Sequence, residues 1–177
     1  MRHWSQLARV ICMSVCTLLG LVVTSPAQQD GSQATTTCNF DPQKQLALEY
    51  QQVTFNPKKP LFGHQVPYNK VWAPGGKPMT LFANAPVAVG NTTLPAGAYT
   101  LFLIPSEKHW MLVISKSTDM SGKYQPQDDL VRVPMDEAQL PSPQDALNAV
   151  FGHIAPSECN LRVYLDKSAV WVGFTEK

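Results

Sequence analysis

Three histidines beyond the N-terminal segment are the side chains that most readily suggest acid-base or metal chemistry. They are His64, His109 and His153. Metal sites often hold two of their ligands at short spacing, such as histidines at i and i+4. None of the three has a histidine or cysteine at i+2 or i+4. The sequence therefore predicts no metal site and favours surface or hydrogen-bonding roles for these side chains.

One enzymatic interpretation stays open, in which dispersed residues meet only in the folded chain. His64 and His109 could converge in a cleft with Glu107 or Asp119, since acid-base catalysis needs groups within hydrogen-bond reach of the reacting atoms. Local signs of catalysis are missing, because the sequence has no GxSxG turn, no GxGxxG and no phosphate-binding loop. We therefore assign no catalytic residue and no cofactor, and we favour a protein that is not an enzyme.

The segment from Val66 to Lys77 joins aromatic side chains to a glycine turn and is the most suggestive binding loop. Tyrosine and tryptophan present broad, rigid faces to sugars, peptides or protein partners. Glycines let a ligand approach the backbone closely. The opposing interpretation places the two aromatic residues in the core, with a plain turn after them. The predicted ligand-binding residues are Tyr68, Trp72, Gly75, Gly76, Lys77 and the nearby His64.

The first 27 residues have the order of features that a secretory signal peptide requires. Arg2 and Arg9 give a basic start, an uncharged apolar run covers 10–23, and the small residues of Ser25-Pro26-Ala27 suit cleavage after Ala27. The run is short for a membrane span of about 20 residues. An uncleaved anchor stays open as an alternative, and a lipid anchor on Cys16 is disfavoured by the residues before it. We expect a periplasmic or secreted protein with no membrane span after cleavage.

Charge and cysteine usage agree with export. The full chain has a formal net charge of +1, and losing Arg2 and Arg9 leaves it near neutral without a basic stripe, which disfavours nucleic-acid binding. Cleavage would leave Cys38 and Cys159 as the two remaining cysteines. An even pair in an oxidising compartment predicts a disulfide, with two free buried thiols as the alternative.

Short apolar segments separated by turn residues predict one all-β domain over 38–177, after a polar, disordered spacer over 28–37. About nine short antiparallel strands with regular turns indicate a single, jelly-roll-like β-sandwich. The clearest hairpins are 98–105 with 110–115, and 161–165 with 169–174 around Asp166-Lys167-Ser168. The sequence predicts a capped short helix near 143–151, with a strand over 150–154 as the alternative. The buried faces are expected to include Phe82, Val87, Leu101, Leu103, Trp110, Leu112, Ile114, Val131, Val163, Leu165, Trp171 and Val172.

Several motifs in the middle of the chain resemble a family of secreted bacterial proteins known as domain of unknown function 2911. They are Leu61-Phe62-Gly63, then VPYNKVW over 66–72, LPAGAYTLFLIP over 94–105, WMLVI over 110–114 and DLVRV over 129–133. The resemblance implies a signal peptide, one β-rich domain and no assigned activity. It also implies that the 146–154 region is a strand.

This chain departs from the family pattern in its polar positions. Asn56, Lys59 and Ala73 stand at or near positions where members usually carry arginine, and Lys77 stands where they carry asparagine. If those arginines bind an anion in relatives, this chain has lost or altered that site. The sequence as a whole favours a non-catalytic binding or interaction module of the bacterial envelope, with a small molecule, a glycan or an envelope protein as partner. A hydrolase with a site assembled from dispersed His and acidic residues is the alternative.

Overall fold

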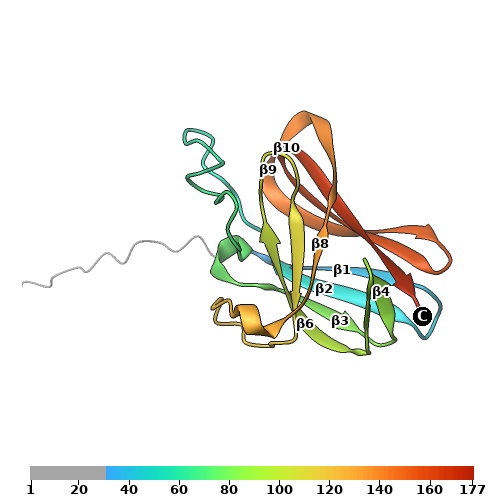
Figure 1. The fold of residues 1–177 in the computed structure, drawn as a ribbon. Coiled ribbons are helices and arrows are strands. Elements are labelled where there is room, and N and C mark those ends of the chain that lie inside the picture. The colour runs from blue at the N-terminus through green and yellow to red at the C-terminus, as the bar shows by residue number, and fades with distance from the viewer. Residues whose placement is uncertain (1–30) are drawn as a thin grey trace, which may run out of the picture.

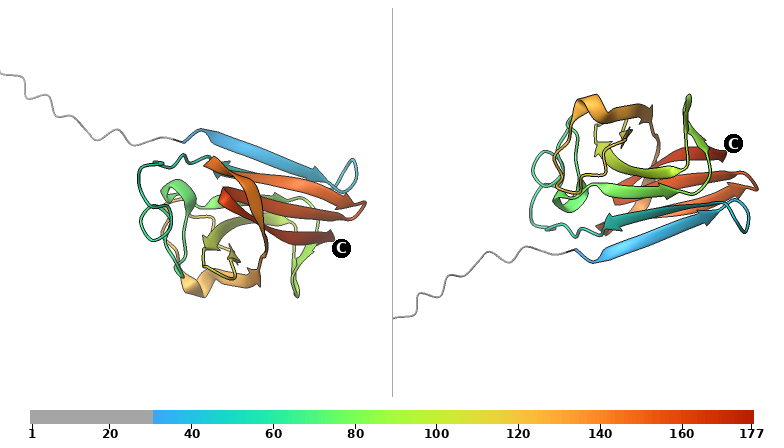
Figure 2. Two further views of the ribbon diagram at one scale, coloured as in Figure 1. Left: turned by 90° about the horizontal axis from the view of Figure 1, so that it is seen from above. Right: turned by 90° about the horizontal axis from the view of Figure 1, so that it is seen from below.

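The computed structural model describes residues 31–177, which form two antiparallel β-sheets packed face to face (Figures 1 and 2). The expected signal peptide and the first three residues of the expected spacer lie outside this range. The first sheet has the strand order β1-β2-β3-β6-β7-β8 and the second has the order β5-β4-β10-β9. This arrangement confirms the predicted all-β sandwich.

The strands of the first sheet are β1 (Gln33–Asn39), β2 (Gln45–Gln51), β3 (Met79–Ala83), β6 (Gly97–Ile104), β7 (Met111–Ser115) and β8 (Asp129–Pro134). Those of the second are β4 (Val87–Val89), β5 (Thr92–Leu94), β9 (Asp136–Ala155) and β10 (Glu158–Glu176). Two short 3-10 turns complete the described part of the chain, η1 (Pro74–Gly76) and η2 (Pro126–Asp128).

The core lies between the sheets because side chains alternate between the two faces of each strand. In β2 the inward residues Leu46 and Leu48 are fully buried, and Leu161 and Val163 of β10 face them from the second sheet. Burying a leucine side chain fully contributes about 1.5 to 3 kcal/mol. Most of the expected core residues are buried, Val131 partly so, but Phe82 (40% exposed) and the half-buried Trp171 point outward. Each alternates with inward neighbours, so the expectation was wrong for both.

β10 folds back on itself. A straight strand of 19 residues would span about 60 Å, yet the backbone N–H of Glu176 donates to the carbonyl of Ser157 at 2.8 Å. The reversal is at Asp166, which has a left-handed φ of 49°. The expected terminal hairpin is therefore present, and we call its limbs the outgoing limb (158–165) and the returning limb (168–176). β9 pairs with both limbs and passes around the hairpin tip.

Two local expectations were wrong. The helix predicted near 143–151 is part of β9. There the N–H of Leu147 donates to the carbonyl of Val53 at 2.8 Å, and residues 148–155 pair with the outgoing limb. These partners override a weak helix propensity. The spacer expected over 28–37 is also wrong for residues 33–37, which belong to β1 and pair with β2 residue by residue. Pairing along the sheet edge holds this polar segment.

Links between the layers close the sandwich along one edge. Cys38 of β1 and Cys159 of β10 form the predicted disulfide, 121 residues apart in sequence. Beside it, β1 runs along β9 (Figure 2), and the N–H of Phe151 donates to Thr36 Oγ1 at 2.9 Å.

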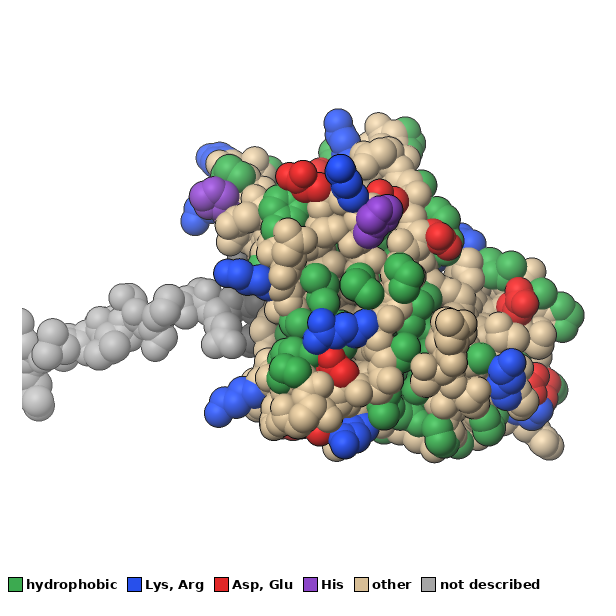
Figure 3. Space-filling model, in the orientation of Figure 1, with side chains coloured by type: hydrophobic (Ala, Val, Ile, Leu, Met, Phe, Trp, Pro, Cys, Tyr) green, Lys and Arg blue, Asp and Glu red, His purple; other side chains and the backbone are tan. Residues whose placement is uncertain are grey.

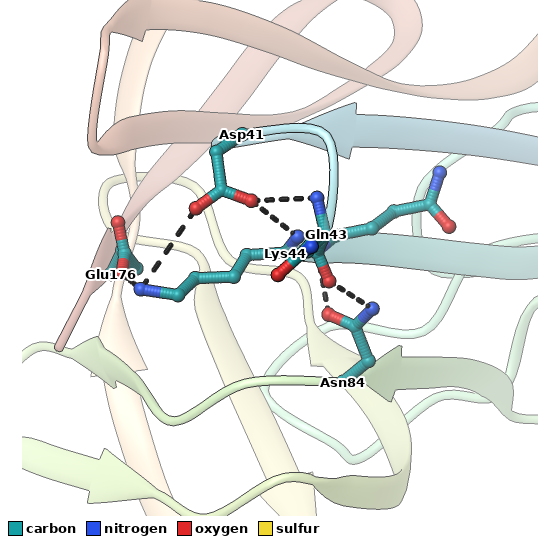
Figure 4. Close-up of polar contacts among 6 residues, drawn as sticks. Asp41, Gln43, Lys44, Asn84 and Glu176 are labelled. Carbon is teal, nitrogen blue, oxygen red and sulfur yellow. Dashed lines mark hydrogen bonds and ion pairs between the residues drawn. The ribbon is translucent and has the colours of Figure 1, made fainter.

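The turn between β1 and β2 ties the start of the first sheet to the end of the second (Figure 4). Asp41 Oδ1 accepts hydrogen bonds from the backbone N–H groups of Gln43 (2.7 Å) and Lys44 (2.8 Å). The Lys44 ammonium reaches Glu176 on β10, and this bond holds the pKa of Lys44 above its ordinary value. Asn84 fastens the same turn by donating to the carbonyl of Gln43 at 2.9 Å.

The segment 116–128, which we call the cover loop, crosses the outer face of the first sheet. Thr100 Oγ1 donates to the carbonyl of Ser117 at 2.8 Å, and Thr80 Oγ1 lies 3.2 Å from Met120 Sδ. Gly122 then packs directly on the η1 turn, where a Cβ atom added to it would lie 2.3 Å from the carbonyl oxygen of Gly76. The cover loop therefore contacts the sheet at Thr80 and Thr100 and the η1 turn at Gly76.

Removing the disulfide should lower stability markedly. The bond joins cysteines 121 residues apart, and the chain-entropy treatment gives about 5 kcal/mol for a loop of this length. We expect the Cys38→Ser/Cys159→Ser variant to lose this amount in urea unfolding monitored by circular dichroism. Wild-type protein under reducing conditions is the control and should match the variant. An unchanged midpoint in both would show that the bond adds no stability.

Gly122→Ala should destabilise more than Gly63→Ala. Both glycines have a left-handed φ, +78° and +80°, so each substitution carries the same backbone penalty of about 1 to 2 kcal/mol. Gly63 has open space around it, whereas Cβ at Gly122 meets the Gly76 carbonyl. We expect an extra loss of about 1 to 3 kcal/mol for Gly122→Ala, measured by urea unfolding. Equal losses would mean that the cover loop does not rest on Gly76.

Candidate functional site

The structure divides the predicted binding residues between two places. Tyr68 stacks on Phe62, with ring centroids 5.1 Å apart and planes at 12°, and Phe62 meets the edge of Trp110 at 6.2 Å. Burial raises the pKa of the Tyr68 hydroxyl. Tyr68 also lines a small pocket of about 370 Å³ with Asn69 and Glu107. His64 is exposed in the preceding loop.

Trp72 lies between these two places and extends the first sheet. Its N–H donates to the carbonyl of Leu103 at 2.7 Å, and the N–H of Leu103 returns the bond at 3.0 Å. The indole is partly buried and packs against the core. These hydrogen bonds and this packing hold Trp72 to β6. They agree with the opposing interpretation of Trp72, in which the side chain belongs to the core.

The glycine turn and Lys77 border a groove on the outer face of the first sheet. We call it the Lys77 groove. It has a volume of about 600 Å³, which is within the range of small-molecule sites. It is lined by Gly31, Gln33, Glu49, Tyr50, Gln51, Lys77, Pro78, Thr80 and Met120. The sheet forms its floor, and Met120 of the cover loop contributes to one wall.

Each residue of the predicted glycine turn takes part in shaping this groove. Lys77 lines it directly. Gly75, at φ +68°, leaves room for the side chain of Gln51, since a Cβ there would lie 2.7 Å from Gln51 Oε1. Gly76 supports the cover loop through Gly122. Of the six predicted residues, Lys77 alone lines the groove, and Gly75 and Gly76 lie behind it, in contact with the residues that shape it. The sequence predicted a platform around the aromatic side chains instead.

The groove offers hydrogen-bonding groups of both kinds and opposite charges. Gln33 Nε2 donates to Glu49 Oε2 at 3.2 Å, which orients that carboxylate. Lys77 is exposed and forms no ion pair or side-chain hydrogen bond with any residue of 31–177. Gln51 Oε1 is buried and has no donor within the same range. Pro78 and Met120 add apolar surface. This combination suits a polar molecule with some apolar area.

A polar network that the sequence did not single out holds the far end of the cover loop. Tyr124 and Asp129 are hydrogen-bonded through the tyrosine hydroxyl, and Arg132 Nε donates to Asp129 Oδ2 at 2.9 Å. The Tyr124 ring meets the edge of Phe102 at 5.3 Å. Burial raises the pKa of Tyr124, and the bond to Asp129 raises that of Arg132. The DLVRV motif, noted only as a family feature, carries two of these residues.

The residues of the hydrolase alternative do not form a connected set. The Asp119 carboxylate accepts hydrogen bonds from the backbone N–H and the hydroxyl of Ser121, both at 2.8 Å, and these bonds lower its pKa. His109 belongs to the turn after β6, where its carbonyl accepts from the Ser106 hydroxyl. Within 31–177, no hydrogen bond or ion pair joins any two of His64, Glu107, His109 and Asp119. The histidine side chains visible in Figure 3 stand apart from one another.

No three His, Cys, Asp or Glu side chains of residues 31–177 lie close enough together to hold a metal ion. Over the same range, no helix combines the length and apolar character needed to cross a bilayer.

Comparisons with known proteins identify the family but no activity. Searches of curated proteins and of solved structures found no match. The family described as "Protein of unknown function (DUF2911)" matches residues 31–174, which includes both sheets, the cover loop and the Lys77 groove. The chain belongs to the DUF2911 family.

Proposed function

We propose that this protein is an exported, non-catalytic binding module of the bacterial envelope and that it binds a polar small molecule or a short glycan in the Lys77 groove. The observation that supports this proposal is the groove itself, a concavity of about 600 Å³ whose lining mixes charged, amide and apolar groups. Pockets of this size with a few placed polar groups are the usual sites of small ligands.

The charges of the groove indicate how a ligand would be held. Lys77 is an exposed cation with three donors and no protein partner in residues 31–177. Glu49 is an acceptor already oriented by Gln33. A ligand carrying hydroxyl groups satisfies both, because a hydroxyl donates to the carboxylate and accepts from the ammonium. Tyr68, Trp72 and His64 remain predicted contacts, and Tyr68 would act at its own smaller pocket.

Export rests on two features taken together. The N-terminal pattern of basic residues, apolar run and small residues is that of a cleaved signal peptide. The Cys38–Cys159 disulfide is compatible with an oxidising compartment. We therefore propose a periplasmic or secreted location, where an envelope glycan, a cell-wall fragment or an envelope protein would be the partner.

A thermal-shift panel of neutral sugars, cell-wall fragments and small anions tests the binding proposal. A ligand that binds the folded state raises the melting temperature by mass action, by about 2.7 kcal/mol of added stability at one hundred times Kd. We expect one ligand class to give a dose-dependent rise, and Lys77→Ala with Glu49→Gln to remove it.

The matched control is Lys70→Ala, another exposed lysine of the same segment that does not line the groove. It should leave the shift unchanged. Tyr68→Ala tests the smaller pocket, because a shift that is lost in this variant and kept in the Lys77 and Glu49 variant would come from that pocket and not from the groove. A flat panel, or a shift that survives the double substitution, would count against the groove, and in the first case pull-downs from envelope extracts would become the test of a protein partner.

A further inference from the structure

A second concave site lies on the opposite layer of the sandwich, on the outer face of β10. It is a pocket of about 350 Å³ lined by Asn160, Arg162, Tyr164, Ala169 and Trp171. All five residues come from β10, three from the outgoing limb and two from the returning limb. The family comparison assigns nothing to this surface, and none of the ligand-binding residues predicted from the sequence lies in it.

The hairpin geometry of β10 builds this pocket. Because Ser157 and Glu176 are hydrogen-bonded and the chain reverses at Asp166, Arg162 lies beside Trp171 on the neighbouring limb. The inward neighbours Val163 and Val170 are buried in the core, so the alternate residues point outward. Gly173 opposes Asn160, whose Oδ1 is 3.5 Å from the position a Cβ would take there. The missing side chain leaves open space between the larger ones.

Arg162 is the unusual group of this pocket. It is half-buried, yet it forms no ion pair or hydrogen bond with any residue of 31–177. The other arginine in this range, Arg132, is bound to Asp129. The guanidinium of Arg162 lies against Gly152 of β9, where an added Cβ would be 3.2 Å from Cζ. The cation is thus held in place by packing while its donors remain available.

The surrounding groups define the ligand that would fit. A guanidinium is a planar fork that pairs with a carboxylate through two parallel hydrogen bonds. Trp171 and Tyr164 offer flat apolar faces with polar edges, and the Asn160 amide both donates to and accepts from hydroxyl groups. One ligand carrying a carboxylate, a flat C–H face and hydroxyls would use all of these groups.

We propose that the Arg162 pocket binds a uronic acid residue of an acidic oligosaccharide. The carboxylate pairs with Arg162, the sugar ring stacks on Trp171 or Tyr164, and a ring hydroxyl bonds to Asn160. Asp136 pairs with Trp171 in the sheet register and therefore lies two strands away from Arg162, about 10 Å at the usual strand spacing. Asp136 therefore forms no ion pair with the Arg162 guanidinium. This site is independent of the Lys77 groove.

The test measures binding of three uronate oligosaccharides to the purified chain: oligogalacturonate, alginate fragments and hyaluronan fragments. Isothermal titration and tryptophan fluorescence are the readouts. We expect one of them to bind, and Arg162→Ala to weaken that binding at least tenfold. Arg162→Lys, which keeps the charge and loses the fork, should weaken it nearly as much. Trp171→Ala should weaken it and abolish the fluorescence change.

Controls separate this site from the fold and from the other groove. Lys167→Ala removes an exposed cation at the hairpin tip and should leave binding unchanged. Binding that is lost in Lys77→Ala but kept in Arg162→Ala would place the sugar in the Lys77 groove and overturn this proposal. The melting temperature of each variant tests whether it is folded. Gly152→Ala is a second variant of the same site, because its Cβ would press on the guanidinium and shift it by a few tenths of an ångström; it should weaken binding less than Arg162→Ala. Absence of binding by all three acidic oligosaccharides at millimolar concentration overturns the proposal. So does equal binding of a neutral galacto-oligosaccharide, or displacement of the uronate by an equal concentration of inorganic phosphate.

Discussion

At Asp166 the chain takes a left-handed turn, and β10 returns along its own outgoing limb as the centre of the second sheet. β9 pairs along both limbs, and β4 pairs with the last three residues of the returning limb. The inward residues of the hairpin, including Val163 and Phe174, face the first sheet and belong to the core. Without this reversal the second layer would have neither its order nor its buried face.

A disulfide and an ion pair, which contribute unequally to stability, join the first sheet to that hairpin. The Cys38–Cys159 bond restricts the unfolded chain across 121 residues, and this entropic effect is large. The Lys44–Glu176 pair lies near the surface, where an ion pair contributes little, but it occurs within a turn already fixed by Asp41 and Asn84. The disulfide therefore dominates the attachment, and the polar contacts set the position of the chain ends.

Since both inner faces are used for the core, both candidate sites lie on outer faces. The Lys77 groove depends on the cover loop, which is held by Gly122 on Gly76 and by the Tyr124–Asp129–Arg132 network. The Arg162 pocket is lined by the two limbs of the hairpin, with Gly152 of β9 packed against the guanidinium. One site is thus built from a loop laid over a sheet and the other from two limbs of one strand, which makes them separately accessible to mutation.

The sequence by itself determined the local features of this protein. Turn residues and apolar alternation specified a two-sheet β fold and the Asp166 hairpin, and an even cysteine count specified the disulfide, because these depend on neighbours in the chain or on simple pairing. Tertiary structure decided the rest. Residues 143–151 are a strand because β10 and Val53 supply partners that no local pattern reveals. Trp171 points outward because its strand phase is set by Val170 and Val172 facing the core. Arg162 and Trp171 line one pocket, and Lys77 and Glu49 line one groove, only because the sheets bring together residues that are distant along the chain. A sequence pattern contains no such distances.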